Sequence, residues 1–310
     1  MRQVPTRSSH CWRLRAGRQR RSVPAGVMVT GQSPREDGLE GQPRLNAAAG
    51  PAPPPRAVRG PAAAAAALLL AGVAACGSSG SAPARCAATA PGEASAVLDV
   101  EQTQNAATIA VVGKRLGLAD HAVSVALATA LQESKLRNLN YGDRDSLGLF
   151  QQRPSQGWGP PAKILVPRLA AAAFYTRLRS VPGWQTLPVA DAAQAVQHSA
   201  SADAYAPWET EARLLARTLT GEVTAALSCS GLPASAALQN AALSAAAGDE
   251  LGPGRLHPTA PGQVWASAGW LVAHAEAFGV SAVTAGGQRW TRRSGQWQFD
   301  AAAGSGVHYA

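Results

Sequence analysis

Apolar residues recur at helical spacing through most of the chain between residues 97 and 227. The first such stretch, 97–116, stops at Gly117, a common helix end, and Asp120 stands where the N-cap of the next helix is expected. Pro-Gly and Ser/Asp breaks separate the later helical stretches, which we predict over residues 162–178, 189–198 and 204–227. The pattern predicts a mainly helical domain.

The helix predicted from His121 to Glu133 is apolar nearly all round, with only Ser124 and Thr129 as polar interruptions. Such a helix is expected to be buried on most sides. Glu133 lies in its last turn, on the same stripe as Ala130. Burial and the negative end of the helix dipole both disfavour a charged carboxylate, so we expect Glu133 to serve as a proton-donating acid. The alternative is a surface glutamate that pairs with a nearby basic side chain.

After this helix, the sequence NYGDRDS at 140–146 is dense in turn-forming residues. The LGLFQQ stretch at 147–152 then combines a flexible Gly148 with two large apolar residues and the amide of Gln151. A small wall segment or hairpin of this kind can present backbone groups and an amide to a sugar ring, and Trp158 is available to stack on that ring. The stretch therefore predicts one wall of a carbohydrate cleft.

These two stretches resemble a known family. QES at 132–134, followed by SLGLFQ at 146–151, is similar to the lysozyme-like superfamily of soluble lytic transglycosylases and goose-type lysozymes. Their pattern is Glu-Ser, a variable gap and Gly-Leu-Met-Gln or a close variant. The resemblance covers about residues 100–215. It implies a lysozyme-like helical domain in which Glu133 is the catalytic acid and base. By the same resemblance, the structural or substrate-binding residues of the cleft are Ser134, Gly148, Leu149, Phe150 and Gln151.

The family's later Ala-Tyr-Asn-Ala-Gly segment has no clean match. ADAYAPWE at 202–209 supplies Tyr205 but lacks the asparagine and the glycine. By the resemblance, Tyr205 contributes to the site by orienting Glu133; the alternative is an aromatic residue packed in the core. The departure keeps open a non-catalytic protein that binds peptidoglycan through a degenerate cleft.

The activity that the resemblance implies is cleavage of the MurNAc-GlcNAc β-1,4 bond in peptidoglycan glycan strands, without metal or cofactor. A lysozyme needs a second carboxylate, for which Asp143 and especially Asp145 are the candidates unless they only shape the turn. A lytic transglycosylase needs none, because the substrate's own hydroxyl closes on the anomeric carbon. A muralytic signal similar to resuscitation-promoting factors follows the same single-glutamate logic.

The net charge of +9 is concentrated near the N-terminus. Residues 1–61 hold 11 arginines and 3 acidic side chains, whereas residues 87–228 hold 12 basic and 12 acidic ones, and residues 229–310 hold 4 of each. The part expected to fold is therefore neutral and lacks the basic surface that a nucleic-acid partner requires.

The basic leader has the pattern of a targeting segment. Arg56 and Arg59 precede an apolar run over residues 62–75, which is long enough for a signal peptide and too short for an ordinary membrane span. The run ends in VAAC, which resembles the lipobox of bacterial lipoproteins and implies lipidation of Cys76; the alternative is a plain secretory signal. Residues 1–55 are expected to be disordered, or translated from a start codon placed too early.

Cys86 and Cys229 bracket the neutral helical segment. In an oxidising envelope compartment they form a candidate disulfide, and the alternative is two unrelated thiols. We therefore expect an extracytoplasmic protein of the cell envelope, secreted or held to the membrane by the lipid anchor. The expected divisions are the leader 1–55, the signal peptide with its lipobox 56–76, a tether 77–92, the lysozyme-like domain 93–229, a linker 230–262 and a small module 263–310.

The C-terminal module is predicted to be α+β. A short apolar helix precedes two strands joined at Gly286-Gly287, a favoured hairpin turn. We expect its tryptophans to form a small core rather than a sugar-stacking surface; they are Trp265, Trp270, Trp290 and Trp297. No metal site is expected from the spacing of its histidines. Its role stays unassigned.

Overall fold

The computed structural model describes residues 83–310 apart from residues 200, 202, 235 and 236. The predicted leader, the signal peptide and Cys76 lie outside the described residues. Those that are described belong to one compact unit. They are mainly helical, with two small antiparallel sheets, which confirms the predicted combination of a helical domain and a small α+β part.

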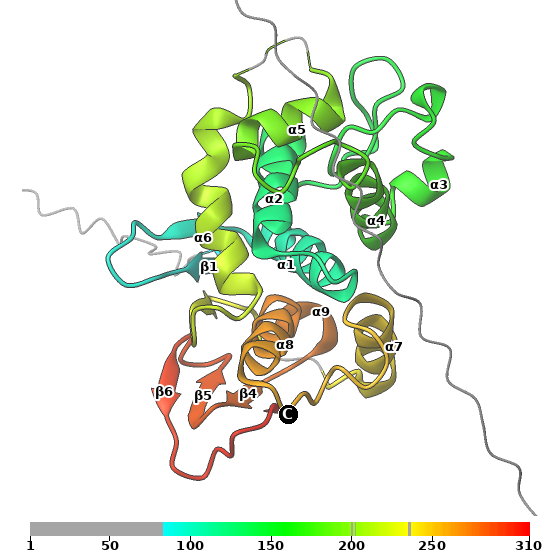
Figure 1. Ribbon diagram of the computed structural model, residues 1–310. Coiled ribbons are helices and arrows are strands. Elements are labelled where there is room, and N and C mark those ends of the chain that lie inside the picture. The colour runs from blue at the N-terminus through cyan, green and yellow to red at the C-terminus, as the bar shows by residue number, and fades with distance from the viewer. Residues whose placement is uncertain (1–82, 200, 202, 235–236) are drawn as a thin grey trace, which may run out of the picture. The chain divides into compact units, whose positions relative to one another are not determined.

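Helix α2 (Asp120–Ser134) contacts all the other long helices of the first part of the chain (Figure 1). These are α1 (Val100–Arg115), α4 (Pro167–Leu178), α5 (Val189–Gln197) and α6 (Glu209–Leu219). Because α2 is surrounded, every residue from Ala122 to Leu131 is buried. The all-round apolar pattern is thus explained by a central position, as expected.

Several element boundaries differ from the predicted ones. Asp99 caps α1 through a capping box with Gln102, so that helix starts at Val100 instead of residue 97. Asp120 is the first residue of α2 and not its N-cap, and its carboxylate pairs with Lys114 at 2.6 Å. The stretch 162–178 is divided between α3 (Pro161–Ile164) and α4, because Pro167 cannot continue a helix. The last predicted helix ends at Leu219, and Gly221 follows it at φ +81.

A three-stranded sheet joins the two ends of the helical part. Its order is β2 (Ala96–Leu98), β1 (Arg85–Ala88) and β3 (Leu227–Ser230), with antiparallel neighbours. Cys86 lies opposite Cys229 in this ladder, and a disulfide with an S–S length of 2.01 Å joins them. The predicted disulfide is confirmed. The predicted tether ends earlier than residue 92, because β1 starts at Arg85.

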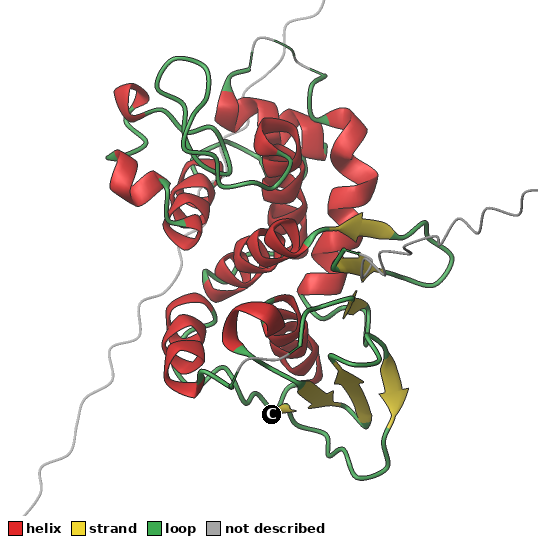
Figure 2. Ribbon diagram, turned by 180° about the vertical axis from the view of Figure 1, so that it is seen from behind, coloured by secondary structure: helices red, strands yellow, loops and turns green. Residues whose placement is uncertain are grey.

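The C-terminal part combines helices with a four-stranded sheet (Figure 2). The helices are α7 (Asn240–Glu250), α8 (Pro261–Ala273) and α9 (Ala275–Phe278). The strands are β4 (Ala282–Ala285), β5 (Gln288–Thr291), β6 (Trp297–Phe299) and β7 (His308–Tyr309), in the order β6-β5-β4-β7. Gly286 and Gly287 form the predicted turn between β4 and β5. Trp265, Trp270 and Trp290 are buried, as expected of a core, and Trp297 is partly buried.

The C-terminal part packs directly on α1. Glu250 accepts hydrogen bonds from Thr108 Oγ1 at 2.9 Å and from Trp270 Nε1 at 2.8 Å. Glu250 ends α7, which lies inside the predicted linker 230–262; Leu243 and Ala247 of that helix are buried. Helices α7 and α8 thus cover a face of α1 that the other helices leave open. No helix in the described part of the chain is long and apolar enough to cross a membrane.

Candidate active site

Glu133 lies in the last turn of α2 and is half-buried. Its Oε1 accepts a hydrogen bond from the Tyr205 hydroxyl at 2.7 Å and a second from Gln197 Nε2 at 3.2 Å. Its Oε2 accepts no hydrogen bond from the described residues. The two oxygens therefore differ, because the protein fixes one of them through two hydrogen bonds and leaves the other without one.

Tyr205 precedes the short helix η2 (Ala206–Trp208), and its ring is fully buried. Burial, together with the negative charge of Glu133, raises the pKa of the Tyr205 phenol. The hydroxyl thus stays protonated and donates to Glu133. The two interpretations of Tyr205, as a core aromatic residue and as a residue that orients Glu133, are compatible, because its ring is buried while its hydroxyl donates to Glu133.

Gln197 is a site residue that the sequence analysis missed. It is the last residue of α5, and its Nε2 donates both to Glu133 and to the backbone oxygen of Phe150 at 2.8 Å. This amide joins the glutamate to the GLFQ segment. Its position in the sequence was the signal that could have found it. Gln197 follows the buried Ala193 by four residues and so lies on the buried face of α5, just as Glu133 lies on the apolar stripe of α2.

The GLFQ segment forms a tight hairpin, in which Leu147 and Gln152 exchange backbone hydrogen bonds at 3.0 and 2.9 Å. Ser134 Oγ donates to the Leu149 backbone oxygen at 2.8 Å and so ties the hairpin to α2. Gly148 has φ +73, and a Cβ there would meet the Ile164 backbone oxygen at 2.8 Å. Ser134 and Gly148 thus fix the backbone of the hairpin that borders the site.

Two predicted binding residues do not face a ligand. The side chains of Leu149 and Phe150 are fully buried, and the Phe150 ring stacks on Phe174 with centroids 4.8 Å apart. Their apolar groups belong to the core, and only their backbone oxygens take part in the site. Of the two predicted roles, structural or substrate-binding, the burial of these side chains favours the structural one.

Gln151 and Trp158 also have partners within the protein. Gln151 adopts φ 45, and its Nε2 donates to the Tyr141 and Gly148 backbone oxygens at 3.3 Å each. The Arg177 guanidinium lies 3.7 Å from the centroid of the Trp158 ring and covers one of its faces. Among the described residues, Trp158 forms no ring contact or hydrogen bond with Glu133, Tyr205 or Gln197.

Asp145 supports the turn between α2 and the hairpin. One carboxylate oxygen pairs with Arg153 Nε at 2.7 Å and with the Ser155 hydroxyl at 3.0 Å, and the other accepts from the Ser155 backbone N–H at 2.8 Å. The hydrogen bond from Arg153, followed by those from Ser155, lowers the pKa of the Asp145 carboxyl. Asp143 is exposed, with Arg144 at 3.8 Å. Asp145 thus has a structural use for both oxygens.

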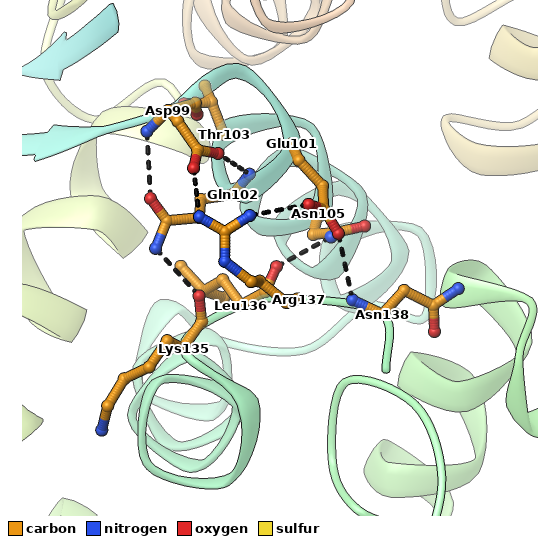
Figure 3. Close-up of polar contacts among 9 residues, drawn as sticks. All are labelled: Asp99, Glu101, Gln102, Thr103, Asn105, Lys135, Leu136, Arg137 and Asn138. Carbon is orange, nitrogen blue, oxygen red and sulfur yellow. Dashed lines mark hydrogen bonds and ion pairs between the residues drawn. The ribbon is translucent and has the colours of Figure 1, made fainter. Parts of the chain in front are cut away.

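The chain immediately after Glu133 has an unusual backbone. Lys135 and Leu136 adopt φ of 56 and 61, a left-handed conformation that costs about 1 kcal/mol or more for each non-glycine residue. Gln102 Nε2 donates to the Lys135 oxygen at 2.9 Å, and Asn105 Nδ2 donates to the Leu136 oxygen at 2.8 Å (Figure 3). The start of α1 therefore holds the loop in place.

Ion pairs complete this anchor. Arg137 pairs with Asp99 and, at 2.7 Å, with Glu101, and the second Glu101 oxygen accepts from the Asn138 backbone N–H at 3.3 Å (Figure 3). Left-handed non-glycine residues also follow Phe150 and Gln197 directly, at Gln151 and at His198. Lys135 and His198 are the C-caps of α2 and α5, a position where the left-handed conformation is common, and Arg144 and Ala225 also have positive φ.

A basic and aromatic pair lies on the other side of Glu133. The Lys135 ammonium is 3.9 Å from the centroid of the Trp208 ring, and Trp208 Nε1 donates to Gln132 Oε1 at 2.7 Å. Burial lowers the pKa of Lys135, although the charges of Glu211 and Glu133 act in the opposite direction. The last turn of α2 is thus fixed on both sides.

In the described part of the chain, no group of three or more metal-ligating side chains is placed to hold a metal ion. In comparisons with known proteins, no family model and no curated protein matches the chain.

Proposed function

We propose that the helical part of this chain cleaves the MurNAc-GlcNAc β-1,4 bond of peptidoglycan glycan strands, with Glu133 as the single acid and base. The observation that carries the proposal is the hydrogen-bonded set of Glu133, Tyr205, Gln197 and the Phe150 oxygen. It joins in space the two motifs on which the resemblance to lytic transglycosylases and goose-type lysozymes depends. We propose a lysozyme-like fold on the same ground.

The chemistry follows from the unequal oxygens of Glu133. Because Oε1 receives two hydrogen bonds, Oε2 is the oxygen from which Glu133 donates its proton in the proposed reaction; Oε2 accepts no hydrogen bond from the described residues. This proton passes to the glycosidic oxygen as that oxygen's bond to the anomeric carbon breaks. The resulting carboxylate then removes a proton from the nucleophile, whose oxygen bonds to the anomeric carbon.

The nucleophile decides between two outcomes. Both oxygens of Asp145 are bound by Arg153 and Ser155, so this residue is poorly suited to activate water or attack the sugar. A single-carboxylate mechanism favours the substrate's own 6-hydroxyl, which closes to a 1,6-anhydro sugar and makes the protein a lytic transglycosylase. If Asp145 took part in the reaction, the product would instead be a reducing sugar.

The decisive variant is Glu133→Gln, which keeps the size of the side chain and removes its acidic proton. We expect this variant to lose clearing of cell-wall material in a zymogram, with an unchanged far-UV spectrum. Glu209→Gln is the matched control, because Glu209 pairs with Arg213 on the surface of α6 and should be dispensable. Clearing by Glu133→Gln equal to that of the unaltered protein would refute the assignment.

Mass spectrometry of the digested wall distinguishes the two nucleophiles. We expect 1,6-anhydro products from both the unaltered protein and Asp145→Asn. Reducing ends that disappear in Asp145→Asn would show instead that this carboxylate is catalytic. Binding of glycan strands without any product would favour the non-catalytic alternative.

We also propose that the protein acts outside the cytoplasm, in the cell envelope. The Cys86–Cys229 disulfide supports this location, because such bonds persist in oxidising compartments. The lipobox implies an anchor at Cys76. We expect Cys76→Ser to move the protein from the membrane fraction to the soluble fraction, and an unchanged distribution would argue against lipidation.

A further inference from the structure

A pocket of about 370 Å³ lies between residues 93–97, which include the first two residues of β2, and the segment from Pro207 into the start of α6. Its apolar lining includes Val97, Pro207 and Leu214. Val97 is unusual for its type, because 54% of its surface is exposed. The pocket thus offers apolar contact that no described part of the chain fills.

Glu211 supplies a carboxylate to this apolar pocket. It is half-buried, and among the described residues it accepts no hydrogen bond and forms no ion pair. Burial raises the pKa of Glu211, and the charge of Lys135 opposes this shift. The Lys135 ammonium is itself placed over the Trp208 ring. A partly desolvated carboxylate without a directly bonded partner is stabilised by a cation that enters the pocket.

The second carboxylate of the pocket already has an ion-pair partner. Glu93 pairs with Arg217, whose Nε also pairs with Glu222 at 2.7 Å. Glu93 therefore fixes the loop before β2 to α6, and Glu211 is the carboxylate of the pocket that has no direct ion pair among the described residues. The Thr89 backbone N–H donates to the Ala226 oxygen at 2.9 Å, and the nearby disulfide secures the same loop. The walls are thus held in place before any ligand binds.

We propose that this pocket binds a primary ammonium group carried on an aliphatic chain. The chain lies along Val97, Pro207 and Leu214, and the ammonium pairs with Glu211. An ammonium has three donors, and Ser95 and Thr210, which line the same pocket, carry hydroxyls able to act as further acceptors. The ligand that carries this ammonium is the diamino acid of a peptidoglycan stem peptide. This identification rests on the proposed function, whereas the preference for an amine rests on the pocket alone.

The test measures binding of a synthetic stem tetrapeptide that contains lysine, by titration calorimetry on the full chain. We expect saturable binding, and a loss of at least about tenfold when the lysine amine is acetylated or Glu211 is changed to Gln. Glu209→Gln, two residues away on the same helix and outside the lining of the pocket, should bind as the unaltered protein does. Equal affinity for the free and the acetylated peptide, or for Glu211→Gln, would overturn the proposal.

A second variant guards against a change in folding at Glu211. Thr210 is exposed at the start of α6, and Thr210→Arg would place a cation in the pocket. It should abolish peptide binding without altering thermal stability, and undiminished binding would argue against the pocket. The peptide contains no sugar, so Glu133→Gln should bind it normally. Failure of the pocket and failure of the glycan-cleaving site are therefore separate results.

Discussion

At the scale of single residues, the site depends on polar groups at the ends of buried helical stripes. Glu133 lies in the last turn of α2 and Gln197 is the last residue of α5, and each continues a face of the helix that is otherwise apolar. The glutamate could be predicted because its stretch also resembled a known motif. Gln197 could not be predicted as a site residue, since an isolated glutamine after VADAAQAV is equally suited to a position exposed to solvent. Its role depends on the approach of two distant helices.

The same scale explains why two apolar residues of the motif support the site and do not face it. Leu149 and Phe150 stand in the motif beside Gly148 and Gln151, and the sequence does not say which side of the hairpin faces the core. In the structure both apolar side chains are buried, and the backbone oxygens next to them hold Ser134 and Gln197. Apolar residues of a motif are thus better predicted as support than as ligand contacts.

Tyr205→Phe tests whether the phenol positions Glu133. The variant keeps the buried ring and removes only the hydroxyl that donates to Oε1 at 2.7 Å. A hydrogen bond to a charged group contributes about 1.5–3 kcal/mol, so we expect kcat to fall roughly ten- to a hundredfold. The measurement is the initial rate of glycan cleavage, alongside the thermal midpoint.

Tyr175→Phe is the matched control, because Tyr175 is also buried and donates to the Ile109 oxygen, at 2.9 Å, away from Glu133. It should lose stability and keep its rate. Equal losses of rate in the two variants would mean that Tyr205 is only a core residue.

At the scale of elements, helices with a clear apolar period were predicted, and their ends were not. The capping box at Asp99, the break before Pro167 and the pairing of residues 96–98 all depend on local backbone geometry. The loop after Glu133 shows the limit clearly. Its left-handed residues, Lys135 and Leu136, are not glycines, and only contacts with α1 make this conformation stable.

Asn105→Ala tests this anchor. The side chain is buried in α1 and donates to the Leu136 oxygen, which would be left without a partner. We expect the free energy of unfolding to fall by about 1–3 kcal/mol, because a buried carbonyl loses its hydrogen bond. Since this loop follows Glu133 directly, the rate of glycan cleavage should fall as well. Urea denaturation and initial rates measure the two effects.

Gln102→Ala offers the comparison, because Gln102 also binds the loop but does so at the surface. Its loss should cost less stability, although it also removes half of the capping box. If Asn105→Ala were as stable and as active as the unaltered protein, the α1 contacts would not be what fixes the loop.

At the scale of the whole chain, local patterns gave little information about how distant segments meet. Residues 230–262 are rich in Ala, Gly and Pro and were predicted as a linker, yet they include α7, which packs on α1 through Glu250. Trp297 of the last sheet donates to the Leu227 oxygen at 2.8 Å and so reaches back to β3. These contacts depend on shape, and no sequence period marks them.

The disulfide is the exception, because a pair of cysteines is visible in the sequence. It closes a loop between residues 143 positions apart and joins strands that start and end the helical part. A cross-link over so long a loop restricts the unfolded chain, so changing both cysteines to Ala should cost about 3–5 kcal/mol. The thermal midpoint should fall by roughly 2–4 °C for each kcal/mol.

Backbone ladders still pair β1 with β3 in that double variant, so glycan cleavage at 25 °C should persist while the folded state is populated. The amine pocket should be affected more, because the disulfide helps to secure its loop. The measurements are the thermal midpoint, the initial rate and the affinity for the lysine-containing peptide. An unchanged midpoint would mean that the strands alone close the domain. Weaker glycan cleavage with normal peptide binding would contradict the expectation that the amine pocket is more sensitive to loss of the disulfide than the glycan-cleaving site.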